Sequence, residues 1–128
     1  MVTEIVRSDK TILIVDYTNR TESQMMQIIT SLKEKIMEKS KPVLILSIFN
    51  DKSYITQGFM RTVERESAAV INLVDKQAVV GLNSTKKLIL KGYNFLFKRN
   101  IQNFETKEEA LKFLLDETTT DKDFRWRI

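Results

Sequence analysis

The sequence predicts an α/β fold: a five-stranded mixed, mostly parallel sheet with one antiparallel edge strand and four helices. Three observations predict it. Short apolar runs rich in β-branched residues alternate along the chain with stretches of helical periodicity. The apolar runs are near-continuous, as in parallel strands that are covered on both faces. The 128 residues include only three glycines and one proline, too few for a turn-rich sandwich or barrel.

Five segments have the composition of strands. The first alternates in polarity, and the turn Ser8-Asp9-Lys10 would return it antiparallel to the second. We expect the other four to be parallel and in sequential order, with the first at one edge, because short right-handed crossovers join neighbouring strands. The last is short and more polar, which suits an edge. In chain order, the predicted strands are 3–7, 11–16, 42–49, 77–82 and 101–104.

Helical periodicity fills the gaps between the strands. The first helix carries apolar residues from Met25 to Ile36 at helical spacing, and the capping-box sequence 21–24 precedes them. An apolar stripe from Phe59 to Val74 predicts the second helix. A second capping box, 106–109, begins the last helix. The four predicted helices cover 25–36, 59–74, 84–99 and 106–115.

The strands 11–16, 42–49 and 77–82 place Ile14, Leu44, Ile45 and Val79 in the predicted core. These residues lie in the middle of the apolar runs, where a sheet covered on both faces buries its side chains. The core prediction therefore depends on the strand positions alone.

The helix at 84–99 is apolar over more than half of its circumference, which is more than one sheet contact requires. Its surplus apolar face must be covered. Neighbouring helices or the C-terminal tail would do so, and the alternatives are a second copy of the chain, a lipid-like ligand or an anionic membrane surface. The candidate interface residues on this helix are Lys87, Leu90, Lys91, Tyr93, Asn94 and Phe97.

Composition excludes most familiar enzyme chemistry. The chain has no Cys and no His, which removes disulfides, the usual zinc sites and the Ser-His-Asp and Cys-His nucleophiles. No Walker or dinucleotide-binding motif is present either. We therefore predict a protein that is not an enzyme, with no cofactor and no metal. A Mg²⁺ site built on Asp16 and Asp51, at the ends of neighbouring strands, is a distant alternative.

The net charge of +4 is unevenly distributed. No acidic residue occurs between Lys76 and Phe104, whereas acids cluster towards the C-terminus. This basic stretch predicts either a solvated lysine face or an anionic partner such as a membrane or an acidic protein, while a nucleic-acid partner has little support. The sequence has no apolar run of about 20 residues and no signal peptide, so we expect a cytoplasmic protein.

Ligands of parallel sheets collect beyond the carboxyl ends of the strands, and the loop at 50–58 is the most polar there. It enters a helix, where backbone N–H groups favour an anion or a phosphorylated side chain. The alternative is structural, with Ser53 or Thr56 capping the helix. The candidate residues of this partner or phospho-switch loop are Asn50, Asp51, Ser53, Tyr54, Thr56, Gln57 and Gly58.

The element order, the polar loop after strand 42–49, the segment Ala78-Val79-Val80-Gly81 and the closing strand and helix at 101–114 resemble the STAS fold of anti-sigma-factor antagonists. The resemblance covers about residues 3–117 and is closest to the stand-alone SpoIIAA-like branch, related in fold to CRAL-TRIO lipid carriers. It implies a phosphorylated serine in an Asp-Ser-Ser-Gly loop. Gln57 stands at the phosphoacceptor position here, which leaves Thr56 or Ser53 as displaced candidates.

Taken with the resemblance, the residues predict one STAS-like domain over 1–117 and a C-terminal tail, docked or disordered, over 118–128. The predicted function is a non-enzymatic regulatory module that acts by protein–protein interaction through the loop at 50–58 and the face of the helix at 84–99. A homodimer is one form of that interaction. The alternative is a carrier or sensor of an apolar or lipid-like ligand, which the CRAL-TRIO relation implies.

Overall fold

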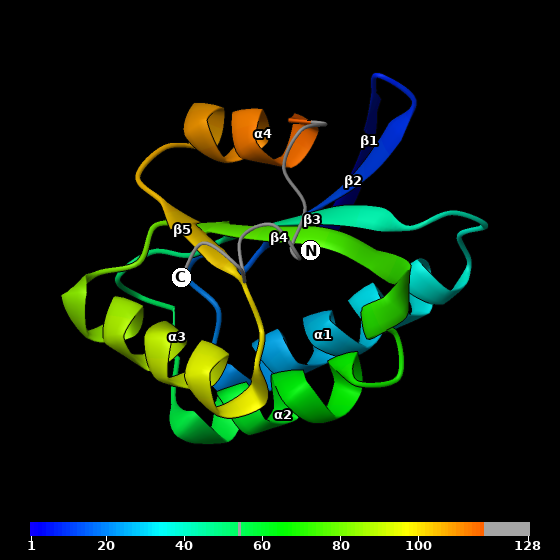
Figure 1. Cartoon of the computed structure of the whole chain (residues 1–128). Helices are drawn as coiled ribbons and strands as arrows, with labels where there is room; N and C mark the ends of the chain where they lie inside the picture. Colours follow the sequence, from blue (N-terminus) through cyan, green and yellow to red (C-terminus); the bar gives the residue numbers. More distant parts are fainter. Residues whose placement is uncertain (54, 117–128) are drawn as a thin grey trace.

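The computed structural model describes residues 1–53 and 55–116, and in it one five-stranded sheet separates two layers of helices (Figure 1). Helix α4 covers one face, whereas α1, α2 and α3 cover the other. Burial of both faces explains why the strands are apolar almost throughout. The elements are β1 (Val2–Arg7), β2 (Lys10–Asp16), α1 (Glu22–Met37), β3 (Val43–Ile48), α2 (Gln57–Ser67), the 3₁₀ helix η1 (Ile71–Leu73), β4 (Val74–Val80), α3 (Ser84–Phe97), β5 (Gln102–Phe104) and α4 (Lys107–Leu115).

The sheet has the order β1-β2-β3-β4-β5. Strand β1 pairs antiparallel with β2, and every other pair is parallel. Ser8 and Asp9 form the β1–β2 turn with φ of 52° and 63°, the left-handed conformation of a hairpin that matches the strand twist. The predicted fold class and strand order are confirmed.

The second helix is shorter than the apolar stripe predicted. It ends at Ser67 instead of continuing to 74, and Val74 is already the first residue of β4, paired with Val43. The apolar stripe predicted too long a helix, because Val70 and Val74 follow the helix but pack against the same apolar core. Strand β4 consequently starts three residues before the predicted 77.

Side chains at the helix starts fix where the chain leaves each loop. The predicted capping box at Thr21 is present, because its side chain accepts from the Gln24 N–H and the Gln24 side chain accepts from the Thr21 N–H. Thr106 caps α4 through the Glu109 N–H, 3.2 Å away. Asn83 caps α3, at a helix start without a capping-box sequence.

The two faces of the sheet form separate apolar cores. Of the predicted core residues, Leu44, Ile45 and Val79 are buried, whereas Ile14 is only half-buried and packs beside the α4 core. Strand alternation sends Ile45 and Val79 towards α1–α3 and Leu44 towards α4.

Two lysines counted in the expected basic surface are buried instead. Lys76 is 1% exposed, and its Nζ donates to the Phe113 carbonyl at the end of α4. Lys86 is also buried and donates to the Asn50 carbonyl at 2.6 Å. Backbone carbonyls at a helix end or in a loop satisfy these ammonium groups, which are therefore structural.

Within residues 1–53 and 55–116, no helix has both the length and the hydropathy needed to cross a membrane.

Candidate functional site

A cavity of about 90 Å³ lies between the sheet and helices α1, α2 and α3. Its floor comes from β3 and β4, with Ile45 and Val79 among the floor residues, while Phe59 of α2 and Leu90 of α3 contribute to its walls. The lining is mostly apolar, as in the pockets that bind small molecules. The cavity is the main candidate functional site in the described part of the chain.

Two polar side chains interrupt the apolar floor. Ser47 of β3 and Gln77 of β4 both line the cavity and are half-buried. They are diagonal neighbours on the sheet, because Gln77 pairs with Ile45 and Ser47 pairs with Val79. Neither side chain forms a hydrogen bond to another residue within 1–53 and 55–116. Their hydroxyl and amide groups are therefore available to bind a polar group of a ligand.

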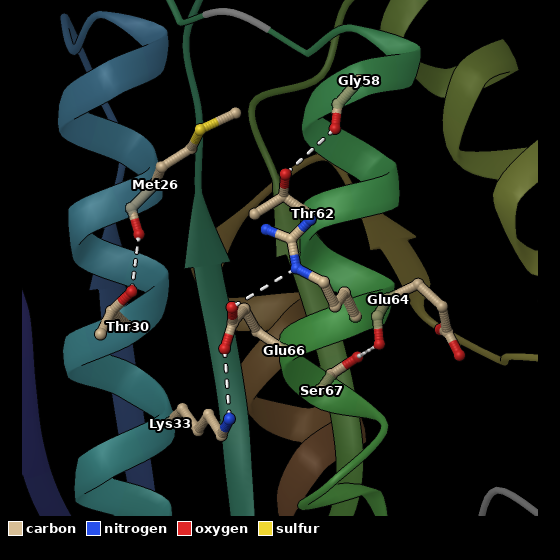
Figure 2. Close-up of polar contacts among 9 residues, drawn as sticks. Met26, Thr30, Lys33, Gly58, Thr62, Glu64, Glu66 and Ser67 are labelled. Carbon is tan, nitrogen blue, oxygen red and sulfur yellow. Dashed lines mark hydrogen bonds and ion pairs between the residues drawn. The ribbon is translucent and has the colours of Figure 1, made fainter.

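An ion pair joins the two helices beside the cavity. Lys33 Nζ of α1 lies 3.2 Å from Glu66 Oε2 of α2, and both residues line the cavity. Arg65 Nε approaches the other carboxylate oxygen of Glu66 at 3.7 Å. Figure 2 shows the Lys33 and Glu66 side chains in the space between α1 and α2. The Lys33 and Glu66 side chains are 31% and 25% exposed, which places the pair at the rim of the cavity.

A second, partly buried network ties α2 to α3. Glu64 accepts hydrogen bonds from the Tyr93 hydroxyl at 2.9 Å and from Arg99 at 2.5 and 3.1 Å. Burial and the neighbouring carboxylate raise the pKa of Tyr93 to about 12. Tyr93 therefore stays a hydrogen-bond donor at neutral pH and fixes α3 beside the cavity. Burial also raises the pKa of Tyr17, which lines the cavity.

The predicted loop at 50–58 is held together by Asn50. Its amide donates to the Asn19 side chain at 2.8 Å, and its own carbonyl accepts from Lys86. Ser53 is 4% exposed, donates to the Tyr17 carbonyl at 2.8 Å and accepts from the Asn50 N–H. These bonds join the loops after β2 and β3 to the first turn of α3, at the carboxyl ends of the strands.

The remaining loop candidates lie apart from this network. Thr56 caps α2 by accepting from the Phe59 N–H at 3.0 Å, and its hydroxyl donates to Glu22. Asp51 and Gln57 are exposed, and Gly58 is half-buried. Tyr54 lies outside the described residues. Thr56 therefore has the capping role that the alternative interpretation offered, whereas Ser53 does not cap α2 and bonds to the Tyr17 carbonyl instead. The partner role of the loop stays a prediction.

The two carboxylates considered for Mg²⁺ have different surroundings. Asp16 accepts hydrogen bonds from the Thr18 N–H at 2.9 Å and the Thr18 hydroxyl at 2.6 Å. Partial burial opposes ionisation of Asp16, but the bonds from Thr18 and the positive charges nearby leave its pKa below the usual value. Asp51 is exposed. Within the described ranges, no three acidic side chains gather into a candidate metal site.

The expected interface on α3 needs a correction. Leu90 and Tyr93 are buried in the core, and Phe97 is partly buried against it, so these residues cannot form an exposed face. The error arose because the apolar arc alone does not say which part of it faces the sheet.

The exposed apolar face of α3 consists of other residues. Leu88, Phe95 and Leu96 are 70%, 85% and 74% exposed. Of the other predicted interface residues, Lys91 is exposed, Lys87 pairs with Glu105 at 2.7 Å, and Asn94 bonds to Ile101. The predicted tail at 118–128, one of the segments expected to cover this helix, lies outside the described residues.

Sequence reasoning did not find the cavity or its rim. Ser47 and Gln77 belong to segments predicted as buried strands, where a single polar residue carries little signal. Lys33 and Glu66 are 33 positions apart and pair only because α1 and α2 pack side by side. The one available signal was a polar residue inside each of two central apolar runs.

Comparison with known proteins found no matching protein-family model, and no curated protein or solved structure was significantly similar. The resemblance to STAS domains therefore stays a prediction. An α/β fold by itself serves many unrelated functions. The cavity and the surfaces around it are therefore the features that bear on function.

Proposed function

We propose that this chain is a non-enzymatic binding module that holds a small, mainly apolar molecule between its sheet and helices α1–α3. The observation that carries the proposal is the pair Ser47 and Gln77, two polar side chains without a hydrogen-bond partner among the described residues, on the floor of an apolar cavity. Ligand pockets combine apolar walls with a few polar groups that orient the ligand. The ligand would have an apolar body and a hydroxyl or carbonyl group facing the floor.

The size of the cavity limits the ligand. Its volume of about 90 Å³ is smaller than the roughly 150 Å³ of a cavity that binds benzene. A single alkyl chain, part of which lies at the rim outside the cavity, suits this space better than a complete membrane lipid. The proposal thus narrows the expected apolar or lipid-like ligand to a small one.

Filling the cavity should abolish binding. We expect Ser47→Leu to weaken the binding of 1-octanol at least about tenfold, because the added side chain occupies the floor and removes a polar contact. Calorimetric titration measures the affinity, and amide shifts in NMR spectra locate the site. Ser40→Leu, on an exposed serine, is the control and should bind 1-octanol as the wild type does.

Two results would contradict the proposal. One is that neither 1-octanol nor 1-hexanol perturbs residues around the cavity at millimolar concentration. The other is that Ser47→Leu binds the alcohols as tightly as Ser40→Leu.

The second candidate function is the regulatory module that binds another protein. The observation that favours it is the exposure of Leu88, Phe95 and Leu96 on one side of α3. Large apolar side chains exposed together are typical of protein interaction sites. Lys91 on the same helix would suit an acidic partner, whereas a second copy of α3 would bring like charges together.

Phe95→Ser tests this second candidate. We expect the variant to lose a protein captured by the wild-type chain while its stability changes by less than about 0.5 kcal/mol, because Phe95 is 85% exposed. The control is Val6→Ser, an exposed apolar position on β1. Sedimentation at high concentration tells self-association from a foreign partner. Equal capture by both variants would contradict a role for α3.

A further inference from the structure

We propose that the molecule bound in the cavity carries an anionic group, and that Lys33 binds this group in place of Glu66. The inference rests on the proposed ligand-binding function and adds the charge of the ligand. A small apolar carboxylate is the class of ligand that fits.

The Lys33–Glu66 ion pair lies at the rim of the cavity, where a bound ligand would meet water. Lys33 and Glu66 lie on different helices, and both line the cavity. Their side chains are 31% and 25% exposed, so they are in contact with both the apolar interior and water. A ligand whose apolar part lies under α1 and α2 would thus present an anionic group at the rim to Lys33 Nζ, while Ser47 and Gln77 on the floor bind a further polar group where the ligand has one. Figure 2 shows Lys33 extending from α1 towards α2 at this rim.

Positive charges outnumber negative charges around Glu66. Two cations, Lys33 and Arg65, share the single carboxylate of Glu66. Within the described residues, neither cation forms another ion pair. The nearest acid along α2, Glu64, is bound by Tyr93 and Arg99. The two cations beside Glu66 therefore leave one positive charge in excess, and an anion at Lys33 would neutralise it.

Exchange of partners would leave no carboxylate without a cation. When a ligand carboxylate accepts hydrogen bonds from Lys33 Nζ, Glu66 keeps the Arg65 guanidinium, whose Nε lies 3.7 Å from its other oxygen. Arg65 is 70% exposed and free to approach Glu66 more closely. Separation of Lys33 from Glu66 would also break the ion pair that joins α1 to α2. The ligand could then enter between these two helices.

The test compares octanoate with 1-octanol, which share an alkyl chain and differ in charge. We expect Lys33→Met to lower the ratio of octanoate affinity to 1-octanol affinity about fivefold or more, since only the anion needs the ammonium group. Glu66→Gln should strengthen octanoate binding, because Lys33 is then released from its carboxylate. Lys35→Met, on the same helix but away from the cavity lining, is the matched control.

Salt gives an independent readout. Octanoate binding to the wild type should weaken between low and physiological ionic strength, and this dependence should be smaller in Lys33→Met. If Lys33 had only a structural role, Lys33→Met would change the affinities for octanoate and 1-octanol equally. The ratio of the two affinities would then stay the same.

The outcomes separate the two proposals. If 1-octanol binds but Lys33→Met leaves the ratio of octanoate to 1-octanol affinity unchanged, the anionic ligand is overturned and the binding function stands. If neither probe binds the wild type at the cavity, both proposals fail.

Discussion

Replacement of Gly81 by alanine is expected to lower the free energy of unfolding by about 3 kcal/mol or more. Gly81 follows β4 with a φ of 87°, a backbone conformation that residues other than glycine rarely adopt. An added Cβ would lie 1.9 Å from the Phe49 carbonyl oxygen and 2.8 Å from its carbon. Both are backbone atoms, so a rotamer change cannot relieve the contact.

The clash would spread to the candidate site. Phe49 lines the cavity and its N–H donates to the Val80 carbonyl at 3.0 Å, so any shift at Gly81 separates the ends of β3 and β4. We therefore expect Gly81→Ala to weaken ligand binding as well as stability.

Gly92→Ala is the matched control. Gly92 lies on α3 and an added Cβ would meet no atom within 4 Å. Alanine should therefore stabilise the helix by about 0.5–1 kcal/mol. Chemical denaturation of both variants measures the difference. A loss below about 1 kcal/mol for Gly81→Ala would show that the two strand ends have room to move apart.

The sequence predicted the topology because the signals for it are local. Apolar β-branched runs mark β2 and β3, and the cap at Thr21 marks the start of α1. The turn at 8–10 determines the antiparallel hairpin. Each of these signals depends on residues within one element or one turn, and tertiary packing did not override them.

The errors occurred where distant residues decide the outcome. Lys76 looks like a surface residue in the sequence, yet it is buried because carbonyls at Phe113 and Asp116 accept its hydrogen bonds. Val70 and Val74 continue the spacing of α2 but follow its end at Ser67. The spacing of apolar residues indicates which of them are buried. It does not show whether all of them belong to one helix.

The candidate site was the least predictable feature. A cavity is the space that packed side chains leave, and it depends on the distances among α1, α2, α3 and the sheet. The polar loop was found from its composition, but composition could not show that Ser53 points inward to the Tyr17 carbonyl. Similarly, the apolar arc of α3 predicted an exposed face, but only packing assigns that face to Leu88, Phe95 and Leu96.

The second large effect is expected at Leu44, in the core on the other face of the sheet. We predict that Leu44→Ala lowers the free energy of unfolding by about 2–5 kcal/mol, because the lost burial is increased by the cost of a cavity. Leu44 is 2% exposed and belongs to the cluster that α4 covers with Ala110, Phe113 and Leu114. Strand β3 is paired on both sides, so the backbone cannot collapse into the space.

Leu88→Ala provides the comparison for Leu44→Ala, because it removes the same atoms from a side chain that is 70% exposed. Its cost should stay below about 0.5 kcal/mol. Urea denaturation gives both values, with an unchanged slope if only stability differs. Since Leu44 faces away from the ligand cavity, its variant should still bind 1-octanol wherever it remains folded. A cost under about 1 kcal/mol would contradict the close packing of Leu44 against α4.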